Sequence, residues 1–542
     1  MTESRRKLLT LIATILGSTI VFLDGTVVNV ALPVISEDLD AGLADQQWIV
    51  EAYMLATVSL LLVGGALGDQ FGRRRIFIAG LIGFGVTSVL CAIAPTSETL
   101  IGSRALQGLA GALLVPGSLA ILTATFEGAE RGKAIGTWTA WTGIATVFGP
   151  AGGGALVEAL SWRAIFWVNI PLIVGCILLA LACVRESVDP EADRAIDWLG
   201  IALSAVGLGG PVYALIEQPR EGWGSPMVYV PLIGGVLLFA FFLFWESRYR
   251  HAMLDLRLFR IRNFAITNFE TLIVYAGLIG AFLFVTLFLQ QTAGYSPLAA
   301  GFATIPISLL LFLLSPRFGR IAISTGPRMP MCVGPIVGGI GLLLLTRVGA
   351  DADYVTEVLP GVLVFGLGLS ATVAPLTATA LNSVEQRYAG IASGINNGVS
   401  RMAGLLAIAV LGALIAGQFG STVNAEVADA ALTPGAEQAL ESAKANPFVP
   451  PDTGGLASGE AEAVAAAATE GAESSFHLAM VVNGILMIIG GLVAGIGIQN
   501  PRREDDWIAP RAAPAGECAR CDEAGHTGDH HEHSAEPAAT PG

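Results

Sequence analysis

The chain has 542 residues, of which 53% are hydrophobic and 13% are charged. Soluble domains usually carry about 25% charged residues, so this composition excludes an ordinary soluble domain and favours a protein that crosses a lipid bilayer. The formal net charge is −15, but nearly all of it lies in two polar segments, 417–475 and 501–542. The acidic balance therefore predicts no nucleic-acid partner, and the apolar body of the chain is almost neutral.

Long apolar segments recur along the chain. A helix that spans a bilayer needs roughly 20 predominantly apolar residues. Fourteen segments meet this requirement, and they are 8–32, 48–68, 76–94, 99–123, 134–158, 164–184, 196–217, 227–246, 265–290, 300–316, 329–347, 356–378, 389–416 and 477–499. The first is too long for the apolar core of a signal peptide, so we expect it to be retained. We predict an all-α membrane protein with fourteen transmembrane helices.

The loops between these segments differ in charge. Lys and Arg are enriched in the cytoplasmic loops of membrane proteins. If the N-terminus is cytoplasmic, most of the 29 basic residues fall on the cytoplasmic side, and the outward loops hold only Arg163, Arg220, Arg347 and Lys444. This asymmetry predicts a multi-pass protein of the cytoplasmic (inner) membrane, with both termini in the cytoplasm.

The tripeptide Phe-Gly-Arg occurs at two corresponding places. It stands in GDQFGRRR (68–75) after the second apolar segment and in SPRFGR (315–320) after the tenth. Duplicated halves are typical of secondary transporters, whose substrate site lies near the midplane between the halves. We therefore expect a six-helix half at 1–190, two inserted helices at 191–250 and a second six-helix half at 251–500.

Two polar segments flank the last apolar one. We expect 417–475 to be a large outward loop, solvated and partly mobile, because it is rich in Ala, Glu, Gly and Pro. An Ala-rich or amphipathic helix over roughly 458–474 is the alternative for part of it. From 501 to 542 we expect a disordered cytoplasmic tail.

Cysteine and histidine residues cluster in this tail, at Cys518, Cys521, His526 and His530. Such ligands bind zinc or copper when the chain holds them together. Only one Cys-x-x-Cys pair is present, in a segment without predicted structure, so we expect a dispensable tail and no functional metal site. A metal-responsive membrane protein stays open as an alternative.

An acidic residue, Asp24, lies within the first apolar segment. An acid at this depth is costly and usually faces a water-filled pathway or a partner, so it indicates a functional site. Burial disfavours the charged form of a carboxyl group and a nearby cation favours it, so a balanced group exchanges protons as a cavity opens to either side. The alternative is a structural Asp held by helix N–H groups or by Thr26 or Asn29.

A permanent cation, Arg104, lies in the fourth apolar segment. A cation in this environment needs a carboxylate, carbonyl groups or water as its partner. Asp24 is a candidate partner. The alternative is an arginine near a helix end whose side chain extends to the bilayer surface.

Four motifs in the first half resemble those of one transporter family. They are LDGTVVNVALP (23–33), GALGDQFGRRR (65–75), RALQGLAGALLVPG (104–117) and GIATVFGPAGGGALVE (143–158). Together they resemble the major facilitator superfamily, and specifically its fourteen-span drug:proton antiporter branch. The resemblance covers all fourteen segments. It implies the major-facilitator fold of two six-helix halves plus two additional helices, with no enzyme activity and no cofactor.

The resemblance implies a role for each motif. It places Asp24 and Arg104 in proton coupling. It makes the loop after the second segment a conformational switch, carried by Gly65, Asp69, Gly72, Arg73 and Arg74. It associates the fourth motif with export, through close helix packing at Gly143, Gly149, Pro150 and Gly153. The alternatives are a purely topological role for the basic loop and ordinary close packing for the glycines.

Other polar residues within the apolar segments are candidates for the substrate cavity. They are Asn29, Glu51, Gln107, Glu270, Asn396, Asn397 and Arg401. Glu51 alternatively meets lipid headgroups, and the three residues of segment 389–416 alternatively hydrogen-bond across helices. The chain has no phosphate-binding loop and no nucleophile–base pair, so we expect neither nucleotide-driven transport nor catalysis.

The sequence therefore predicts a monomeric secondary exporter in which protons enter while a lipophilic small molecule leaves. The buried acids favour cationic or neutral solutes over anions. An exporter dedicated to an endogenous lipid, siderophore or secondary metabolite is the alternative, because the generic apolar residues of the segments name no substrate.

Overall fold

The computed structural model describes residues 2–126, 128–188, 197–249, 254, 256–384, 389–428, 430 and 432–500. At residues 62–63, 65–66, 69, 128–129, 131–133, 135–136, 139–140, 143–148, 323, 389–391 and 393 it describes the backbone alone. The predicted tail and its candidate metal ligands Cys518, Cys521, His526 and His530 lie outside the described residues.

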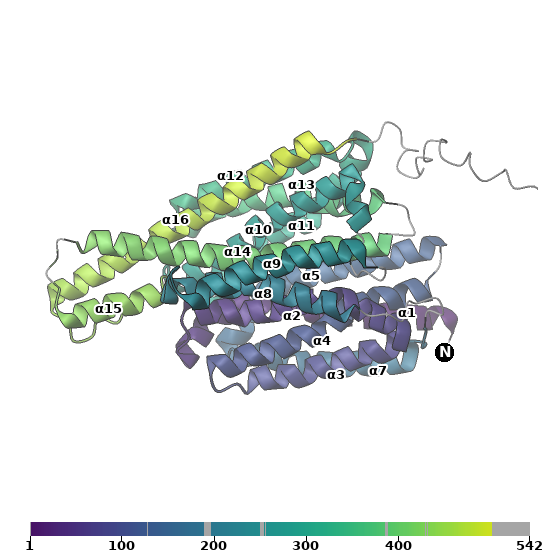
Figure 1. Cartoon of the computed structure of the whole chain (residues 1–542), viewed down its shortest axis with the longest axis horizontal. Coiled ribbons are helices and arrows are strands. Elements are labelled where there is room, and N and C mark those ends of the chain that lie inside the picture. The colour runs from purple at the N-terminus through teal and green to yellow at the C-terminus, as the bar shows by residue number, and fades with distance from the viewer. Residues whose placement is uncertain are drawn as a thin grey trace, which may run out of the picture. The chain divides into compact units, whose positions relative to one another are not determined.

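Helices make up nearly all of the described chain, and no strand occurs in that part of it (Figure 1). The helices are α1 (Glu3–Leu39), α2 (Leu43–Phe71), α3 (Arg73–Ala92), α4 (Ser97–Thr125), α5 (Gly128–Ala159), α6 (Ala164–Trp167), α7 (Asn169–Cys183), α8 (Trp198–Glu221), α9 (Pro226–Arg248), α10 (Arg262–Gln291), α11 (Pro297–Thr325), α12 (Arg328–Leu344), α13 (Leu359–Asn382), α14 (Ala389–Glu426), α15 (Pro434–Ala445) and α16 (Ser458–Gly497). Short helical turns add η1 (Leu256–Arg260), η2 (Leu345–Arg347) and η3 (Tyr354–Val358).

Twelve helical segments within the described residues are long and apolar enough to cross a membrane. Helices α2 and α5 have 29 and 32 residues, but each contains positions that lack a side-chain description, and neither is among the twelve. The predicted all-helical membrane fold is confirmed, and the number of fourteen spans stays a prediction. The helices begin and end within a few residues of most predicted segments, because a run of apolar residues sets the length that fits a bilayer.

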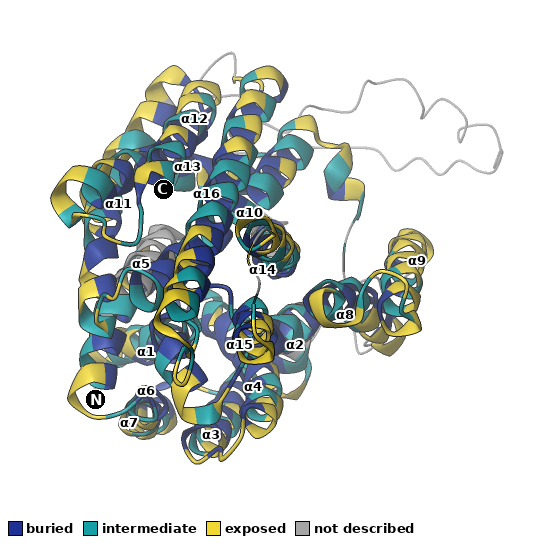
Figure 2. Cartoon of the chain, turned by 90° about the vertical axis from the view of Figure 1, so that its left-hand side faces the viewer, coloured by how far each residue is buried: buried dark blue, intermediate teal, exposed yellow. Residues whose placement is uncertain are grey.

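Helices of the same half pack against one another. In the first half α4 packs against α2 and α3, and α1 packs against α5. In the second half α16 packs against α10 and α12, and α13 packs against α11 and α12. Helices α8 and α9 pack on each other, and α8 also contacts α2 and α14 (Figure 2). The inserted pair, α8 and α9, thus lies beside one helix from each half. The predicted boundaries of this pair, near 190 and 250, fall outside the described residues.

The two halves contact each other at the end of the bundle that carries the turn between α1 and α2 (Asp40–Gly42), here called the distal end. The main contacts are those of α5 with α11, α2 with α14 and α1 with α10. Gln47 Nε2 donates a hydrogen bond of 3.1 Å to the carbonyl of Ile408. Gln290 Nε2 donates one of 3.0 Å to the carbonyl of Val30. The distal ends of the halves are therefore held together by both packing and hydrogen bonds.

Glycines set the closest helix contacts inside the second half. In α13, a Cβ atom on Gly368 would collide with the backbone of Gly338 in α12. Two turns earlier along α13, a Cβ on Gly361 would lie 2.6 Å from Cδ2 of Leu345, which directly follows α12. The absence of side chains lets the two helices approach closely, which raises the number of van der Waals contacts between them.

The predicted outward loop at 417–475 is largely helical, so the expectation of a solvated loop is wrong. Helix α14 continues to Glu426, α15 lies within the segment, and α16 begins at Ser458. The alternative of a helix at 458–474 is confirmed. Alanine is both the best helix former and small enough to pack closely, so an Ala-rich composition fits packed helices as well as a loop.

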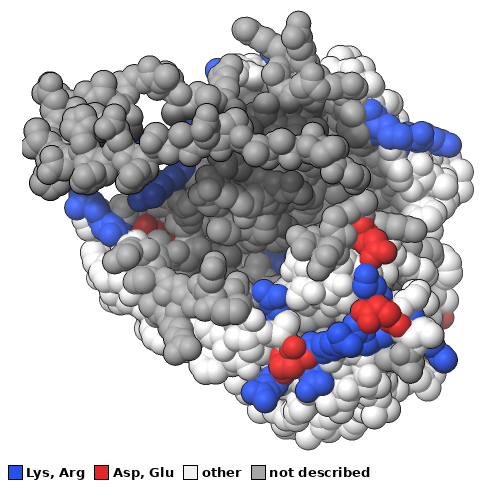
Figure 3. All heavy atoms as spheres, turned by 90° about the vertical axis from the view of Figure 1, so that its right-hand side faces the viewer, with Lys and Arg blue, Asp and Glu red and all other residues white. Residues whose placement is uncertain are grey.

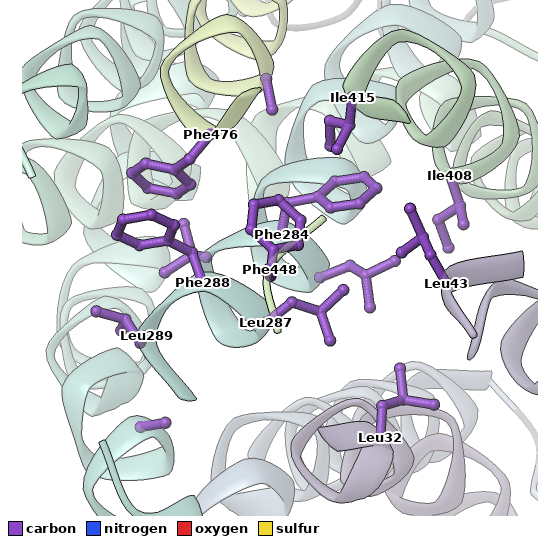
Figure 4. Packing of buried hydrophobic residues seen from close by; sticks show 14 of the residues in the cluster. Leu32, Leu43, Phe284, Leu287, Phe288, Leu289, Ile408, Ile415, Phe448 and Phe476 are labelled. Atoms are coloured by element: carbon purple, nitrogen blue, oxygen red, sulfur yellow. The ribbon is translucent and has the colours of Figure 1, made fainter. Parts of the chain in front are cut away.

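The segment between α15 and α16 is anchored to the bundle by one aromatic side chain. Phe448 is buried, and its ring centroid lies 6.3 Å from that of Phe284 and 6.2 Å from that of Phe288, both in α10 (Figure 4). Phe288 also stacks on Phe476 of α16 at 4.1 Å. The helical segment at 417–475, here called the cap, thereby continues the apolar core beyond the distal end.

We predict that Gly368→Ala lowers the free energy of unfolding by about 1–3 kcal/mol, because the added methyl group forces α12 and α13 apart. Gly420→Ala in α14 is the matched control, since a Cβ there meets nothing within 4 Å. Because alanine favours helix more than glycine does, this control variant should be as stable as the parent chain or more stable. Thermal unfolding of both variants in detergent measures the difference, and equal stabilities would contradict the proposed close packing.

Candidate functional site

Asp24 lies near the middle of α1 and is 2% exposed. Its Oδ2 atom forms an ion pair with Nη1 of Arg104, which projects from α4 and is 1% exposed. Its Oδ1 atom accepts hydrogen bonds from Gln107 Nε2 at 3.1 Å and from Asn169 Nδ2 at 3.0 Å. The carboxylate thus meets a full charge and two amide donors inside the first half.

Arg104 is held on several sides. Its Nη1 also donates to Gln107 Oε1 at 2.6 Å, and its Nε donates to the carbonyl of Ile49 at 3.2 Å. The guanidinium carbon lies 4.2 Å from the ring centroid of Tyr53, a cation–π distance. The alternative of an arginine that extends to the bilayer surface does not fit this geometry, because the side chain ends in the core.

Two further residues complete the network and were not identified from the sequence. Ser88 Oγ in α3 accepts hydrogen bonds from Gln107 Nε2 at 3.0 Å and from Asn169 Nδ2 at 3.3 Å. Asn169 opens α7, and both residues are fully buried. A lone polar residue inside an apolar segment was the available signal, but serine and asparagine occur at many such positions for purely local reasons.

The network links α1, α3, α4 and α7 around one ion pair, and Arg104 also joins it to α2. Removing a charge pair from water is expensive, and the Coulomb attraction compensates only when hydrogen bonds satisfy the remaining polar atoms. Here the amides of Gln107 and Asn169 supply those bonds. The alternative partner Thr26 instead donates to the carbonyls of Phe22 and Leu23 in its own helix. Such a pair responds strongly to protonation of Asp24, because a neutral acid leaves Arg104 without a counterion.

The loop between α2 and α3 is built around a glycine. Gly72 has a φ of +108°, and a Cβ there would lie 2.6 Å from Glu186 Oε1. Only glycine adopts this conformation without strain. The Arg73 backbone N–H donates to the carbonyl of Ser187, and the Arg74 N–H donates to Glu186 Oε1, at 3.0 and 3.1 Å. The predicted switch residues Gly65 and Asp69 lie at positions whose side chains are not described.

Glu186, which follows α7, is the partner of the basic loop and was not singled out in the sequence. Its Oε2 lies 3.8 Å from Arg74 Nε and 3.7 Å from Arg75 Nε. Figure 3 shows Lys and Arg side chains gathered on this end of the bundle, with Asp and Glu side chains among them. The α2–α3 loop is thereby fastened to the end of α7, within the same half.

The glycines of the fourth motif face two helices. A Cβ on Gly153 of α5 would lie 2.7 Å from Val27 Cγ1 in α1. On the other side of α5, a Cβ on Gly154 would lie 2.9 Å from Leu298 Cα in α11. Gly149 lies against Thr26. Helix α5 thus packs between α1 of its own half and α11 of the other half at the distal end. Gly143 falls among the positions without a side-chain description.

Gln107 joins the Asp24 network, whereas the other cavity candidates lie apart from it. Asn396 of α14 donates to Asn268 Oδ1 at 3.2 Å and to Thr271 Oγ1 at 2.8 Å, both in α10. Arg401 Cζ lies 5.5 Å from the ring centroid of Phe22, across the contact between the halves. Asn397 makes an interaction too, and Asn29 Oδ1 is buried without a hydrogen-bond partner among the described residues.

Two acids among these candidates are fully buried. Glu51 and Glu270 are 0% exposed, and none of their four carboxyl oxygens has a hydrogen-bond partner in the described part of the chain. A pocket of about 460 Å³ lies elsewhere, at the distal end between α1, the α10–α11 turn and the cap. Its lining includes Glu37, Asp40 and Tyr295. The role of Glu51 and Glu270 in a substrate cavity therefore stays a prediction.

The profile of the Major Facilitator Superfamily matches residues 14–408. The chain belongs to this superfamily of membrane transporters, which confirms the resemblance carried by the four motifs. The multidrug resistance protein Stp of Mycobacterium tuberculosis is 36% identical over 422 residues, 78% of either chain. The tetracenomycin C resistance and export protein of Streptomyces glaucescens is 32% identical over 508 residues, 93% of this chain and 94% of that protein.

A solved structure shares the fold. A bacterial homolog of the human lysosomal transporter Spinster superposes with a TM-score of 0.62 at 17% identity, over 90% of this chain and 97% of that one. At this identity the likeness concerns the helix arrangement alone.

We predict that Asp24→Asn and Arg104→Gln each lower the free energy of unfolding by about 3–5 kcal/mol, because each leaves an uncompensated buried charge. The double variant should lose less than the sum of the two, because it buries no charge at this place. Thermal or denaturant unfolding of the three variants in detergent gives the coupling energy. Additive losses would mean that the two charges do not stabilise each other.

Proposed function

We propose that the protein is a proton-coupled exporter of drugs and other lipophilic small molecules across the cytoplasmic membrane. The observation that carries this proposal is the buried Asp24–Arg104 ion pair, held by Gln107 and Asn169 in one half of a major-facilitator fold. Relatives of similar length are named for multidrug resistance and for antibiotic resistance and export. The names of these relatives support export over uptake.

In this mechanism Asp24 carries the proton. The ionised carboxylate pairs with Arg104 in the structure described here. A proton on Asp24 removes the ion pair, and the guanidinium must then find water or another acceptor. The arrangement of α1 against α4 consequently depends on the charge of Asp24. Because Asp24 is 2% exposed, helix movement must precede its contact with water.

We further propose that the distal end faces the outside and is closed in this structure. The supporting contacts are those of α5 with α11, α2 with α14 and α1 with α10. Rocking of the halves would open this end and close the opposite one, which exposes a site between them alternately. In the outward-open form Asp24 takes up a proton and the cargo leaves. In the inward-open form Asp24 releases the proton and new cargo binds.

A transport assay tests the proton-coupling role of Asp24. Inverted vesicles that contain the full chain should show proton movement when lipophilic cationic drugs are added under an imposed proton gradient. We expect Asp24→Asn to abolish this movement, because an amide side chain does not bind and release a proton as a carboxyl group does. Drug-dependent proton movement at the wild-type rate in this variant would contradict the proposed role.

Asp353→Asn is the matched control for that assay. Asp353 is exposed and caps η3 by accepting a hydrogen bond from the Thr356 N–H at 2.9 Å. Asparagine caps helices as well as aspartate does, so this variant changes the same functional group without affecting the ion pair. Rates should be normalised to folded protein, because Asp24→Asn also lowers stability.

We predict that Gly154→Leu holds the distal end open, because a side chain there collides with Pro297 and Leu298 of α11. Transport should fall about tenfold or more. Cysteines introduced at the distal end should become accessible to water-soluble thiol reagents. Gly152→Leu in the same helix is the control, since a Cβ there meets nothing within 4 Å. Equal transport by the two leucine variants would exclude α5–α11 closure as part of the cycle.

A further inference from the structure

Glu51 of α2 is an acid for which the mechanism above has no role. It lies eight residues into α2 from the distal end and is 0% exposed. Neither carboxyl oxygen has a hydrogen-bond partner among the described residues. An isolated ionised carboxylate in apolar surroundings is so unfavourable that the group takes up a proton instead. The structure therefore contains Glu51 in a setting that suits the neutral acid.

The residues one turn away show which way Glu51 faces. Residues three and four positions apart share one face of a helix. Four residues before Glu51, Gln47 donates a hydrogen bond to the Ile408 carbonyl of α14. Three residues after Glu51, Met54 packs with a cluster that contains Leu405 and Ala409 of α14. Glu51 consequently lies on the face of α2 that contacts α14, and α14 belongs to the other half.

The surroundings of this face are apolar. Ala44 and Leu55, on the same side of α2, belong to the cluster formed with Leu208 and Val212 of α8. The cluster thus joins α2, α8 and α14 around the level of Glu51. The carboxyl group is enclosed by the contact of α2 with α14, which is one of the contacts between the halves that close the distal end.

Among the residues whose side chains the structure describes, no charged group on the helices around α2 forms a hydrogen bond or ion pair with Glu51. The titratable and charged side chains nearest its level on α1, α2, α3, α4, α8 and α14 are Asp24, Asp45, Tyr53, Cys91, Arg104, Tyr213, Glu217, Arg220 and Arg401. Arg104 pairs with Asp24, and Arg220 lies 3.8 Å from Asp45. Glu217 accepts a hydrogen bond of 3.1 Å from Trp48 Nε1.

Arg401 is the remaining cation in this region. Its guanidinium carbon lies 5.5 Å from the ring centroid of Phe22 in α1. The other cations are paired elsewhere, and Arg401 is engaged on α1. An ionised Glu51 would therefore remain without a counterion when α2 and α14 are in contact.

We propose that Glu51 is the proton-binding residue of the distal barrier, which closes only when this carboxyl group is protonated. When α2 and α14 separate, water reaches Glu51, and the group ionises by giving its proton to that water. The ionised side chain cannot re-enter the apolar contact, so the barrier stays open until a proton from the distal side binds again. The proton returns to the side from which it came, so Glu51 controls closure and carries no net charge across the membrane.

This inference rests on the proposed alternating access, and it is independent of which residue couples drug movement to protons. Protonation of Glu51 makes the return to the closed form faster at low external pH. Glu51 would thus bind a proton from the outer side before the halves close. The cargo plays no part in this step.

Electron–electron distance measurements test the proposal. Spin labels are placed on the full-length chain in lipid nanodiscs at Leu160 and Val355, two exposed residues of different halves near the distal end, with the native cysteines replaced by alanine. The pH is varied with wild-type Glu51 and with Glu51→Gln. For one linked proton, the ratio of closed to open forms changes by up to about tenfold per pH unit.

With Glu51 present, we expect the short distance to dominate at low pH and a longer distance to grow as the pH rises. Glu51→Gln should keep the short distance at every pH, with a change below about twofold, because a neutral amide never ionises. Glu51→Asp keeps a titratable group and should retain a pH response. Glu217→Gln removes a partnered acid at the neighbouring contact of α2 with α8 and should behave like the parent chain.

Three results would overturn the proposal. They are the same pH response in Glu51→Gln as in the parent, an open barrier in Glu51→Gln at every pH, and no pH response in the parent. The same distance measurement in Asp24→Asn distinguishes a failure of this inference from a failure of the proposed function. Loss of drug-dependent proton movement with an intact distal response means that the two acids act separately. Wild-type drug coupling in Asp24→Asn would refute the role of Asp24 and leave the distal response as a test of Glu51 alone.

Discussion

The structure depends on one buried ion pair, between Asp24 and Arg104. Both charges lie in the core of the first half and are at most 2% exposed. Their attraction compensates the loss of hydration only because Gln107 and Asn169 satisfy the free carboxylate oxygen. A network of this kind contributes little net stability, but it responds strongly to the loss of either charge. This asymmetry is what a residue that binds and releases protons requires.

The two buried acids of the first half differ in their surroundings. Asp24 meets a guanidinium and two amide donors, and its environment is that of an ionised group. Glu51 meets no donor among the described residues and lies within the contact between α2 and α14. The first acid is partnered inside one half and moves with it. The second is enclosed only while the halves touch, so its hydration follows the opening of the distal end.

Hydropathy was enough to predict an all-helical membrane protein, the four motifs implied the major-facilitator arrangement, and residue type made Asp24 a candidate partner of Arg104. Runs of about 20 apolar residues determine where helices form, and an arginine at the depth of Arg104 needs a carboxylate, carbonyl groups or water. Asn169 and Ser88 were missed because short polar side chains in apolar helices often bond only to their own backbone. Glu186 was missed because an acid after a helix looks like an ordinary solvated charge. That Glu51 faces α14 depends on how α2 packs against α14, and no pattern in a single sequence predicts this packing.

The cap shows where composition misleads. A segment rich in Ala, Glu and Gly resembles a solvated loop, but alanine also gives close-packed helices. Phe448 was an informative residue, because an aromatic side chain in a polar segment needs an apolar contact. It finds that contact between Phe284 and Phe288. The distal end is thus covered by structure that belongs to the second half and continues its core.

The central claim is that the charge of Asp24 changes with the conformation of the protein. Infrared difference spectroscopy measures this directly, because a protonated carboxyl group has a C=O stretching band that an ionised one lacks. Spectra of the closed form and of a form held open at the distal end should differ by such a band, and Asp24→Asn should remove it. A spectrum in which Asp24 is ionised in both forms at every accessible pH would contradict the account.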